Sequence, residues 1–378
     1  MNWGAAILLL FFPILVLSQE SENLVPNPSF EDFSYCPTGF TTQQLDMVRN
    51  WRQPTKGTAD YYNVCSDRMG VPDNIFGHQQ ANSGKGYVGI ITYHPNSADS
   101  REYMQAKLKE PLEEGAYYCV EFYISLANNA SFMTDKIGIH FSQFPSRGTG
   151  TRRLSFKPQV DNPDGNVIKN DSAWVLISSH FKAEGGEQYL TIGNFSSDNE
   201  VQVLQRFLKP ENHERIWDFG YYYLDDISVT RIPDRFACSS TIDLIKMEMP
   251  YPEEYYEKYE EYRLDAVLFD FDRYELTQET LAKLKEAVII LNRYDNFYLE
   301  INGHADVIGR DEYNEKLSKK RAVMVYDYLI EKGIPSDRLR ITYHGSRLPA
   351  VMDEGPEGRR QNRRVEFLIL RKVHGRYN

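Results

Sequence analysis

The pattern of the sequence changes once, near residues 232–262, and this change predicts two folding units. Before it, runs rich in β-branched and aromatic residues, such as GYVGIITY (86–93), alternate with clusters of Gly, Pro, Asn and Asp. Such spacing, without helical periodicity, predicts an all-β sandwich of antiparallel strands over 22–231. After it, strand-like and helix-like segments alternate over 263–378, which is typical of an α+β domain.

The order of elements in the second part follows from its periodicity. LDAVLFDF (264–271) and FYLEI (297–301) have the composition of strands, and Thr277 is placed to cap the helix between them. A second helix is expected from about 311 to 332, because Gly333 and the proline that follows form a stop signal. Two further strands, RLRITYHG and RRVEFLIL, complete a β-α-β-α-β-β order.

The segment 232–262 is predicted to be an acidic, tyrosine-rich linker. Its part from 241 to 262 contains seven acids and two lysines with few aliphatic residues. This composition favours a solvated connector. A docking segment for another protein is the alternative.

The first residues carry an apolar run from Ala5 to Leu17 that ends in small and polar residues. A bilayer crossing needs about twenty apolar residues, so this run predicts a cleaved export signal over 1–18. A retained anchor is the alternative, because MNW contains no Lys or Arg before the run. Since no other stretch is apolar for long enough, the mature chain is expected to lack a transmembrane segment.

Charge and cysteine content narrow the classes of partner. A formal net charge of −11 argues against nucleic acid, which requires a positively charged surface. Four cysteines in an exported chain permit disulfides. We expect a Cys36–Cys65 bridge, worth about 3 to 4 kcal/mol on the loop-entropy model. Cys119 lies in an apolar run and is expected to be a buried free thiol, while Cys238 has no assigned partner.

The stretch GHADVIGRDEYNEKLSKKRA (303–322) holds the most informative pair, Asp306 after a strand and Arg321 on the following helix. If the two side chains converge, the carboxylate can bind an ammonium group and the guanidinium a carboxylate, as in an amino-acid head group. The alternative is a purely structural salt bridge that joins the loop to the helix. For His304, a hydrogen bond that fixes the loop is favoured over a metal site shared with Asp306, because no second His or Cys lies at ligand spacing. No nucleophile is present near the pair, so no catalytic residue is predicted.

This stretch, together with GRRQNRRVEF (358–367), resembles the OmpA-like peptidoglycan-binding domain over about 264–370. The resemblance implies that Asp306 and Arg321 hold the diaminopimelate residue of the peptidoglycan stem peptide. It also places further ligand-binding positions on Asn314, Leu317, Phe271, Asp272, Asn362, Arg363 and Arg364. Three residues depart from the family pattern and are expected to modify affinity, namely Ala305, Asp353 and Gly355.

The two ends of the front part, NLVPNPSFEDF (23–33) and YYLDDISV (222–229), resemble galactose-binding-like jelly rolls, which include many carbohydrate-binding modules. That resemblance implies a structural Ca²⁺ held by Glu31 with Asp225 or Asp226, because calcium prefers several oxygen ligands. Acids that bond to backbone or solvent are the alternative. Candidate sugar-binding aromatics near loop-like sequence are Trp51, Tyr61, Tyr62 and Tyr93.

Together these features predict a non-enzymatic, exported envelope protein of a Gram-negative bacterium, located in the periplasm and associated with the outer membrane. Its rear part is expected to bind peptidoglycan, and its jelly roll a glycan or an outer-membrane protein. One alternative is a glycan-active enzyme with a catalytic front part, which would need two essential carboxylates. The other is an adhesin or assembly component of the outer membrane.

Overall fold

The structure is a computed structural model, and it describes residues 22–39, 44–206, 215–242, 256–258, 264–353 and 355–372. The chain divides into two compact units, a front unit (Met1–Ile242) and a rear unit (Asp243–Asn378). The predicted export signal lies outside the described residues. Within the described ranges, no helix combines the length and apolar character needed to cross a bilayer.

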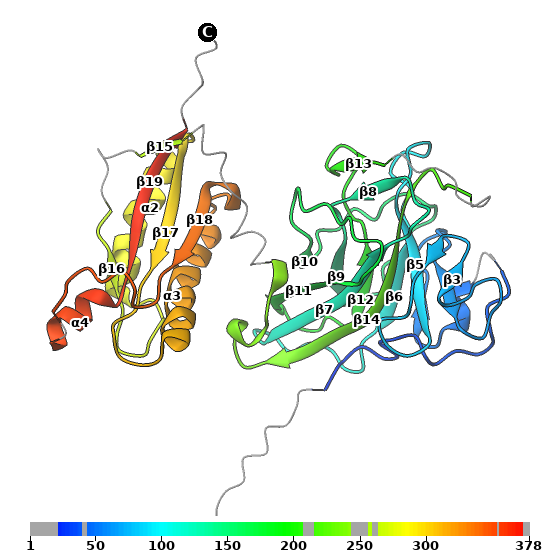
Figure 1. The fold of residues 1–378 in the computed structure, drawn as a ribbon, viewed down its shortest axis with the longest axis horizontal. Helices are drawn as coiled ribbons and strands as arrows, with labels where there is room; N and C mark the ends of the chain where they lie inside the picture. The colour runs from blue at the N-terminus through cyan, green and yellow to red at the C-terminus, as the bar shows by residue number, and fades with distance from the viewer. Residues whose placement is uncertain are drawn as a thin grey trace, which may run out of the picture. The chain divides into compact units, whose positions relative to one another are not determined.

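The front unit is built mainly from two five-stranded antiparallel sheets (Figure 1). The first sheet has the order β1 (Trp51–Arg52), β6 (Tyr103–Lys107), β12 (Tyr189–Gly193), β9 (Gly138–Ser142), β10 (Val160–Asp161). The second has the order β11 (Val175–Lys182), β7 (Tyr117–Leu126), β14 (Gly220–Ile232), β5 (Gly86–Tyr93), β2 (Asp60–Asn63). Two short pairs, β13 (Val203–Gln205) with β8 (Phe132–Thr134) and β3 (Asp73–Asn74) with β4 (Gly77–His78), and two 3₁₀ turns, η1 (Gln44–Met47) and η2 (Arg235–Ala237), complete the described elements.

One hydrophobic core serves both sheets of the front unit, with members such as Ile192 of the first sheet and Ile124 of the second. The central strands are buried along most of their length, which explains why runs such as GYVGIITY are almost continuously apolar. The all-β prediction for this part is therefore confirmed.

The aromatic residues of this core are buried, which makes the predicted sugar-binding role wrong for three of the four candidates. Trp51, Tyr61 and Tyr62 are at most 3% exposed and cannot present a surface to a sugar, whereas Tyr93, the fourth candidate, is half-buried and stays a prediction. The hydroxyl of Tyr62 pairs with that of Tyr221 at 2.9 Å, and Tyr221 donates to Asp60 at 2.7 Å. Aromatic side chains with a polar tip satisfy that tip when buried, so these residues support the fold.

Two disulfides close the front unit. Cys36–Cys65 forms as predicted, but Cys119 is not a free thiol, because it is bonded to Cys238. This second bridge ties the segment after β14 to β7, and the same segment is held where the Ser178 hydroxyl donates to the Ser239 carbonyl at 2.6 Å. Residues 232–242, assigned by composition to the linker, thus pack with the front unit.

The rear unit has a mixed sheet with helices packed against it. The strands are β15 (Tyr256–Lys258), β16 (Val267–Leu268), β17 (Phe297–Gly303), β18 (Leu339–Tyr343) and β19 (Arg364–Lys372). The helices are α2 (Gln278–Arg293), α3 (Asp311–Glu331), α4 (Pro356–Asn362) and the 3₁₀ turn η4 (Ser336–Arg338). β17 and β18 are parallel, whereas β15, β16 and β17 pair antiparallel with β19.

The predicted order of this unit is confirmed, with two additions. The short helix α4 precedes the last strand, and β15, from the predicted linker, pairs with β19. Thr277 caps α2 as expected, because its side chain accepts a hydrogen bond from the Thr280 amide at 3.2 Å. α3 packs over β17 and β18, and Figure 1 shows it running along their length.

The two disulfides are expected to differ in their contribution to stability. Because they close separations of 119 and 29 residues, the loop-entropy model gives the Cys119–Cys238 bridge about 1 kcal/mol more. Replacing both cysteines by alanine should therefore lower the free energy of unfolding more for the Cys119–Cys238 pair than for the Cys36–Cys65 pair. Trp51, Trp174 and Trp217 all lie in the front unit, so tryptophan fluorescence in urea would follow this unit. Equal losses would contradict the prediction.

Candidate functional site

The candidate site lies where four segments of the rear unit meet: the chain after β16, the loop between β17 and α3, the first turns of α3, and the start of β19. Gly303, the last residue of β17, permits this convergence, because a Cβ there would lie 2.1 Å from the Ser318 carbonyl oxygen of α3. Only glycine allows so close a backbone approach. The loop and the helix that carry the predicted pair are therefore held in contact.

Asp306 is fixed in this loop and is 4% exposed. Its Oδ1 accepts a hydrogen bond from the Ile308 amide at 3.0 Å, and its carbonyl accepts one from Asn314 Nδ2 at 3.1 Å. Its Oδ2 forms an ion pair with Arg363 Nη1 at 3.0 Å. The direct partner of the carboxylate is thus Arg363, which the sequence analysis placed in the site without pairing it to Asp306.

Arg321 lies on α3 and is completely buried. Its Nε donates to the Arg273 carbonyl at 2.9 Å, Nη1 to the His304 carbonyl at 3.0 Å and Nη2 to the Asp270 carbonyl at 3.2 Å. Burial, followed by the charge of Arg363, lowers the pKa of Arg321 to about 10, so the side chain stays charged at neutral pH. One guanidinium therefore ties the chain after β16 and the end of β17 to α3.

His304 fixes the loop through its backbone. Its amide donates to the Arg364 carbonyl at 2.9 Å, and its carbonyl accepts from Arg321. Burial and the charge of Arg364 lower the pKa of the imidazole to about 4, which keeps it neutral at neutral pH. Among the described residues, no group of three or more His, Cys, Asp and Glu side chains is arranged to hold a metal ion.

Exposed apolar side chains surround the buried charges. Phe271 is 60%, Tyr313 51%, Ile308 48% and Val307 39% exposed. Tyr313 also donates a hydrogen bond to Asp272, and this bond raises the pKa of the tyrosine. Asp272 has a φ of +57° in the left-handed region, which an aspartate tolerates better than most residues. A ligand with apolar methylene groups and charged ends would find both kinds of contact here.

The remaining predicted residues serve the scaffold. Leu317 is 8% exposed and packs in the core. Asn362 accepts from the Ala350 and Val351 amides at 2.7 and 3.1 Å, and Arg364 donates to the Leu348 carbonyl at 3.2 Å. These two side chains hold the 348–351 segment rather than joining the Asp306 cluster.

The three departures from the family pattern lie in structured positions. The Ala305 amide donates to the Gly345 carbonyl at 2.7 Å, and its methyl group is buried. Asp353 accepts a hydrogen bond from the Gly355 amide at 2.8 Å, just before α4. In this position the Asp353 carboxylate supports the turn into a helix.

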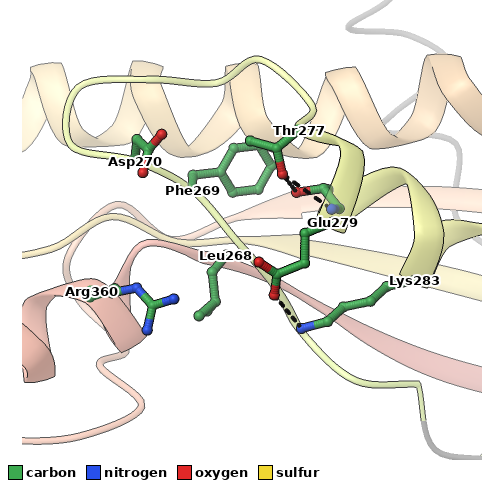
Figure 2. A pocket seen from close by; sticks show the side chains of 8 residues that line it. Leu268, Phe269, Asp270, Thr277, Glu279, Lys283 and Arg360 are labelled. Atoms are coloured by element: carbon green, nitrogen blue, oxygen red, sulfur yellow. Dashed lines mark hydrogen bonds and ion pairs between the residues drawn. The ribbon is translucent and has the colours of Figure 1, made fainter.

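A second feature, a small polar pocket, borders the Leu268–Asp270 segment. Figure 2 shows Asp270, Glu279, Lys283 and Arg360 around it, with Thr277 at the start of α2. Glu279 and Lys283 form an ion pair at 3.6 Å, and neither forms a hydrogen bond or ion pair with Asp306 or Arg321. The residues of this pocket therefore add no binding partner for Asp306 or Arg321.

In the front unit, Glu31, Asp225 and Asp226 all bond to the segment 82–86. Glu31 accepts from the Lys85 and Gly86 amides at 2.7 and 2.9 Å, and Asp225 accepts from the Asn82 amide at 2.9 Å. Asp226 accepts from the Ser83 hydroxyl at 2.6 Å. Burial, followed by the charge of Asp226, raises the pKa of Asp225 to about 8. The acids predicted for calcium thus converge on one loop, where hydrogen bonds already engage them.

The sequence analysis missed three features of the rear site: the Asp306–Arg363 ion pair, the bond from Tyr313 to Asp272, and the apolar rim. Tyr313, Val307 and Ile308 lie inside the stretch 303–322, so their proximity to Asp306 along the chain was visible. Their exposure was not, because it depends on how the loop packs. The contact of Arg363 with Asp306 joins residues 57 apart.

Comparisons with known proteins concern the rear unit. Residues 268–363 match the model of the OmpA family. The peptidoglycan-associated lipoprotein of Rhizobium meliloti is 34% identical over 105 residues, which cover 28% of this chain and 60% of that protein. Outer membrane porin F of Pseudomonas aeruginosa is 36% identical over 101 residues, which cover 26% of this chain and 29% of that protein.

Among solved structures, the peptidoglycan-associated lipoprotein from Burkholderia pseudomallei is 28% identical and is matched over 29% of this chain and 90% of its own, with a TM-score of 0.27. The chain spans between 13% and 60% of the length of the first three curated relatives. The similarity is thus a property of one domain.

The structure suggests a test of the role of Arg321. Replacing it by alanine leaves three buried carbonyls without their donor, which should cost at least about 3 kcal/mol. Loss of the helical circular dichroism signal in urea would measure this, because the long helices α2 and α3 lie in the rear unit. Arg347→Ala, at a 63% exposed side chain, is the matched control and should stay within about 0.5 kcal/mol. A cost below about 1 kcal/mol for Arg321→Ala would show that the carbonyl contacts contribute little.

Proposed function

Because residues 268–363 form an OmpA domain, we propose that this chain is an exported cell-envelope protein that binds peptidoglycan non-covalently through its rear unit. The observation that carries the proposal is the buried Asp306 carboxylate, paired with Arg363 and surrounded by exposed apolar side chains. Two relatives, a peptidoglycan-associated lipoprotein and an outer membrane porin F, support an envelope location.

The ligand would be the diaminopimelate residue of the stem peptide, whose side chain ends in an ammonium and a carboxylate. Asp306 would bind the ammonium group, because only two of its oxygen lone-pair positions are occupied by the Ile308 amide and Arg363. The apolar rim would contact the methylene groups between the charges. Asp306 and Asp272 balance Arg321 and Arg363, and such a cluster favours a zwitterion over an ion of one sign.

The carboxylate of the ligand would be shared by two guanidiniums. Arg321 has five N–H donors and uses three on backbone carbonyls, which leaves two. Arg363 uses Nε on the Phe269 carbonyl and Nη1 on Asp306, and its side chain is 12% exposed. The more accessible Arg363 is therefore the stronger candidate for direct contact, with Arg321 behind it.

We propose that the chain is not an enzyme. A glycan-active front unit would need two carboxylates that act on the scissile bond. Asp60 and Glu102 are neighbouring acids whose pKa values are raised by burial, but they are 5% and 7% exposed and bond to Tyr221 and to the Thr58 and Ile91 amides. Both carboxylates are thus engaged by groups of the front unit's own core, which supports a structural role for this pair.

For the front unit, we propose a jelly-roll module that binds a glycan or an outer-membrane protein. The supporting observations are the two five-stranded sheets on one core and the disulfides, which suit an oxidising compartment such as the periplasm. Outer-membrane association would then come through this unit or its partner. An adhesin or assembly component remains the second candidate, and pull-down from envelope extracts would distinguish it from glycan binding alone.

Binding to the wall can be tested by co-sedimentation of the full chain with peptidoglycan sacculi. Asp306→Asn and Arg363→Gln should each weaken pelleting roughly tenfold or more, because each removes a charge-assisted hydrogen bond. Free diaminopimelate should compete. Arg347→Gln changes an exposed arginine that contacts neither Asp306 nor Arg363, so this variant should pellet like the wild type.

The variants must first be shown to keep the helical circular dichroism signal of the wild type, so that loss of folding is not mistaken for loss of binding. Wild-type protein that stays in the supernatant would exclude wall binding. Equal pelleting of all variants would exclude this site.

A structural calcium ion at Glu31, Asp225 and Asp226 remains a prediction. If calcium binds, it should raise the melting temperature of the front unit followed by tryptophan fluorescence, and EDTA should reverse the rise. Asp226→Asn should abolish the calcium effect, whereas Asp73→Asn, at an exposed acid elsewhere, should preserve it. An unchanged melting temperature in calcium would support the alternative that loop hydrogen bonds alone engage these acids.

A further inference from the structure

The front unit contains a pocket of about 550 Å³ that the wall-binding proposal does not use. Residues of the β3–β4 hairpin, the loop after β7 and Arg215 before β14 line it. Binding sites for small molecules commonly have volumes of about 300 to 1,000 Å³. The pocket therefore has room for a small organic ligand.

One wall of this pocket is held by Asn128. Its Oδ1 accepts from the His78 amide at 2.7 Å, and its Nδ2 donates to the Asp171 carbonyl at 2.7 Å. Gly77 has a φ of +140°, and a Cβ there would lie 2.4 Å from the same Oδ1. A larger residue at position 77 would displace Asn128, so this glycine keeps the hairpin against the loop.

Asn129 is the most informative residue in the pocket. It is 8% exposed, and its backbone is satisfied, since its amide donates to the Phe76 carbonyl and its carbonyl accepts from the Trp217 amide at 3.0 and 2.8 Å. Its side-chain amide lines the pocket but forms no hydrogen bond with the described part of the chain. The amide atoms are not enclosed, so they are accessible from the pocket, where water or a ligand that both donates and accepts can pair with them.

Charged groups of both signs complete the lining. Arg215 stacks on the Trp217 ring, with 3.8 Å from its guanidinium carbon to the ring centroid, and forms no ion pair with the residues that the structure describes. Asp73 Oδ1 contacts His78 Nδ1 at 2.7 Å, which leaves the other carboxylate oxygen and His78 Nε2 available. The Trp217 indole is fixed, because its Nε1 donates to the Ile75 carbonyl at 3.1 Å.

We propose that this pocket binds a short saccharide of one or two rings. Sugar hydroxyl groups both donate and accept, so they can satisfy the Asn129 amide, the Arg215 guanidinium and the Asp73 carboxylate at once. Asp73 opposes binding of a phosphate or another anion, and Arg215 opposes binding of a cation. The inference deepens the proposed role of the front unit as a binding module and is independent of the Asp306 site.

Saturation-transfer NMR on the full chain tests the proposal with six free sugars: glucose, galactose, mannose, N-acetylglucosamine, cellobiose and di-N-acetylchitobiose. At least one should bind, and Asn129→Ala and Arg215→Ala should each weaken it roughly tenfold, the loss expected for one hydrogen bond to a buried or charged group. Asn199→Ala and Arg147→Ala change exposed residues of the same types outside the pocket and should bind as the wild type does.

Asn129→Ala should keep the wild-type urea midpoint, because its side chain forms no hydrogen bond with the described residues. Arg215→Ala should lower the midpoint only slightly, because it loses the stacking on Trp217. Absence of binding by all six sugars, or equal binding by wild type and pocket variants, would overturn the proposal. Asp306→Asn separates the two proposals: it should lose wall pelleting and keep sugar binding. Asn129→Ala should show the reverse.

Discussion

The rear unit depends on one buried guanidinium. Arg321 donates to carbonyls of Asp270, Arg273 and His304, which belong to two loops that no strand pairing joins at this point. A buried charge is costly unless it is hydrogen-bonded, so the loops must present these carbonyls for α3 to pack against the sheet. The position of Asp306, two residues after His304, follows from this requirement. Arg321, which the resemblance assigns to ligand binding, thus also holds together the loops that form the site.

The front unit meets a similar requirement with neutral groups. Its core contains tyrosines whose hydroxyls bond to one another, to Asp60 or to backbone carbonyls, such as Tyr222 to the Ile168 carbonyl at 2.9 Å. A buried hydroxyl without a partner would cost part of the energy gained by burying the ring. The Asn129 amide differs from these hydroxyls, since it lines a pocket instead of being bonded in the core.

Periodicity and end signals predicted the elements of the rear unit well, because they are local. The Thr277 cap, the start of α3 at Asp311 and the alternation in β19 were all evident within a few residues of sequence. The predicted strand 264–271 was reduced to Val267–Leu268, because the following residues leave the sheet to offer carbonyls to Arg321. Composition also assigned 232–242 to the linker, although the Cys119–Cys238 bridge ties this segment to β7.

The sequence by itself determined the division into an all-β and an α+β part and the Cys36–Cys65 pair, and it placed Asp306, Arg321 and Arg363 in one predicted site. These depend on spacing and residue type, which are present in any conformation of the chain. Only the tertiary structure decided that Arg363 pairs with Asp306, that Arg321 donates to three backbone carbonyls, and that Tyr61 and Tyr62 are buried. Those outcomes depend on contacts between residues far apart in the chain and on the need to satisfy every buried polar group, and neither can be read from local pattern.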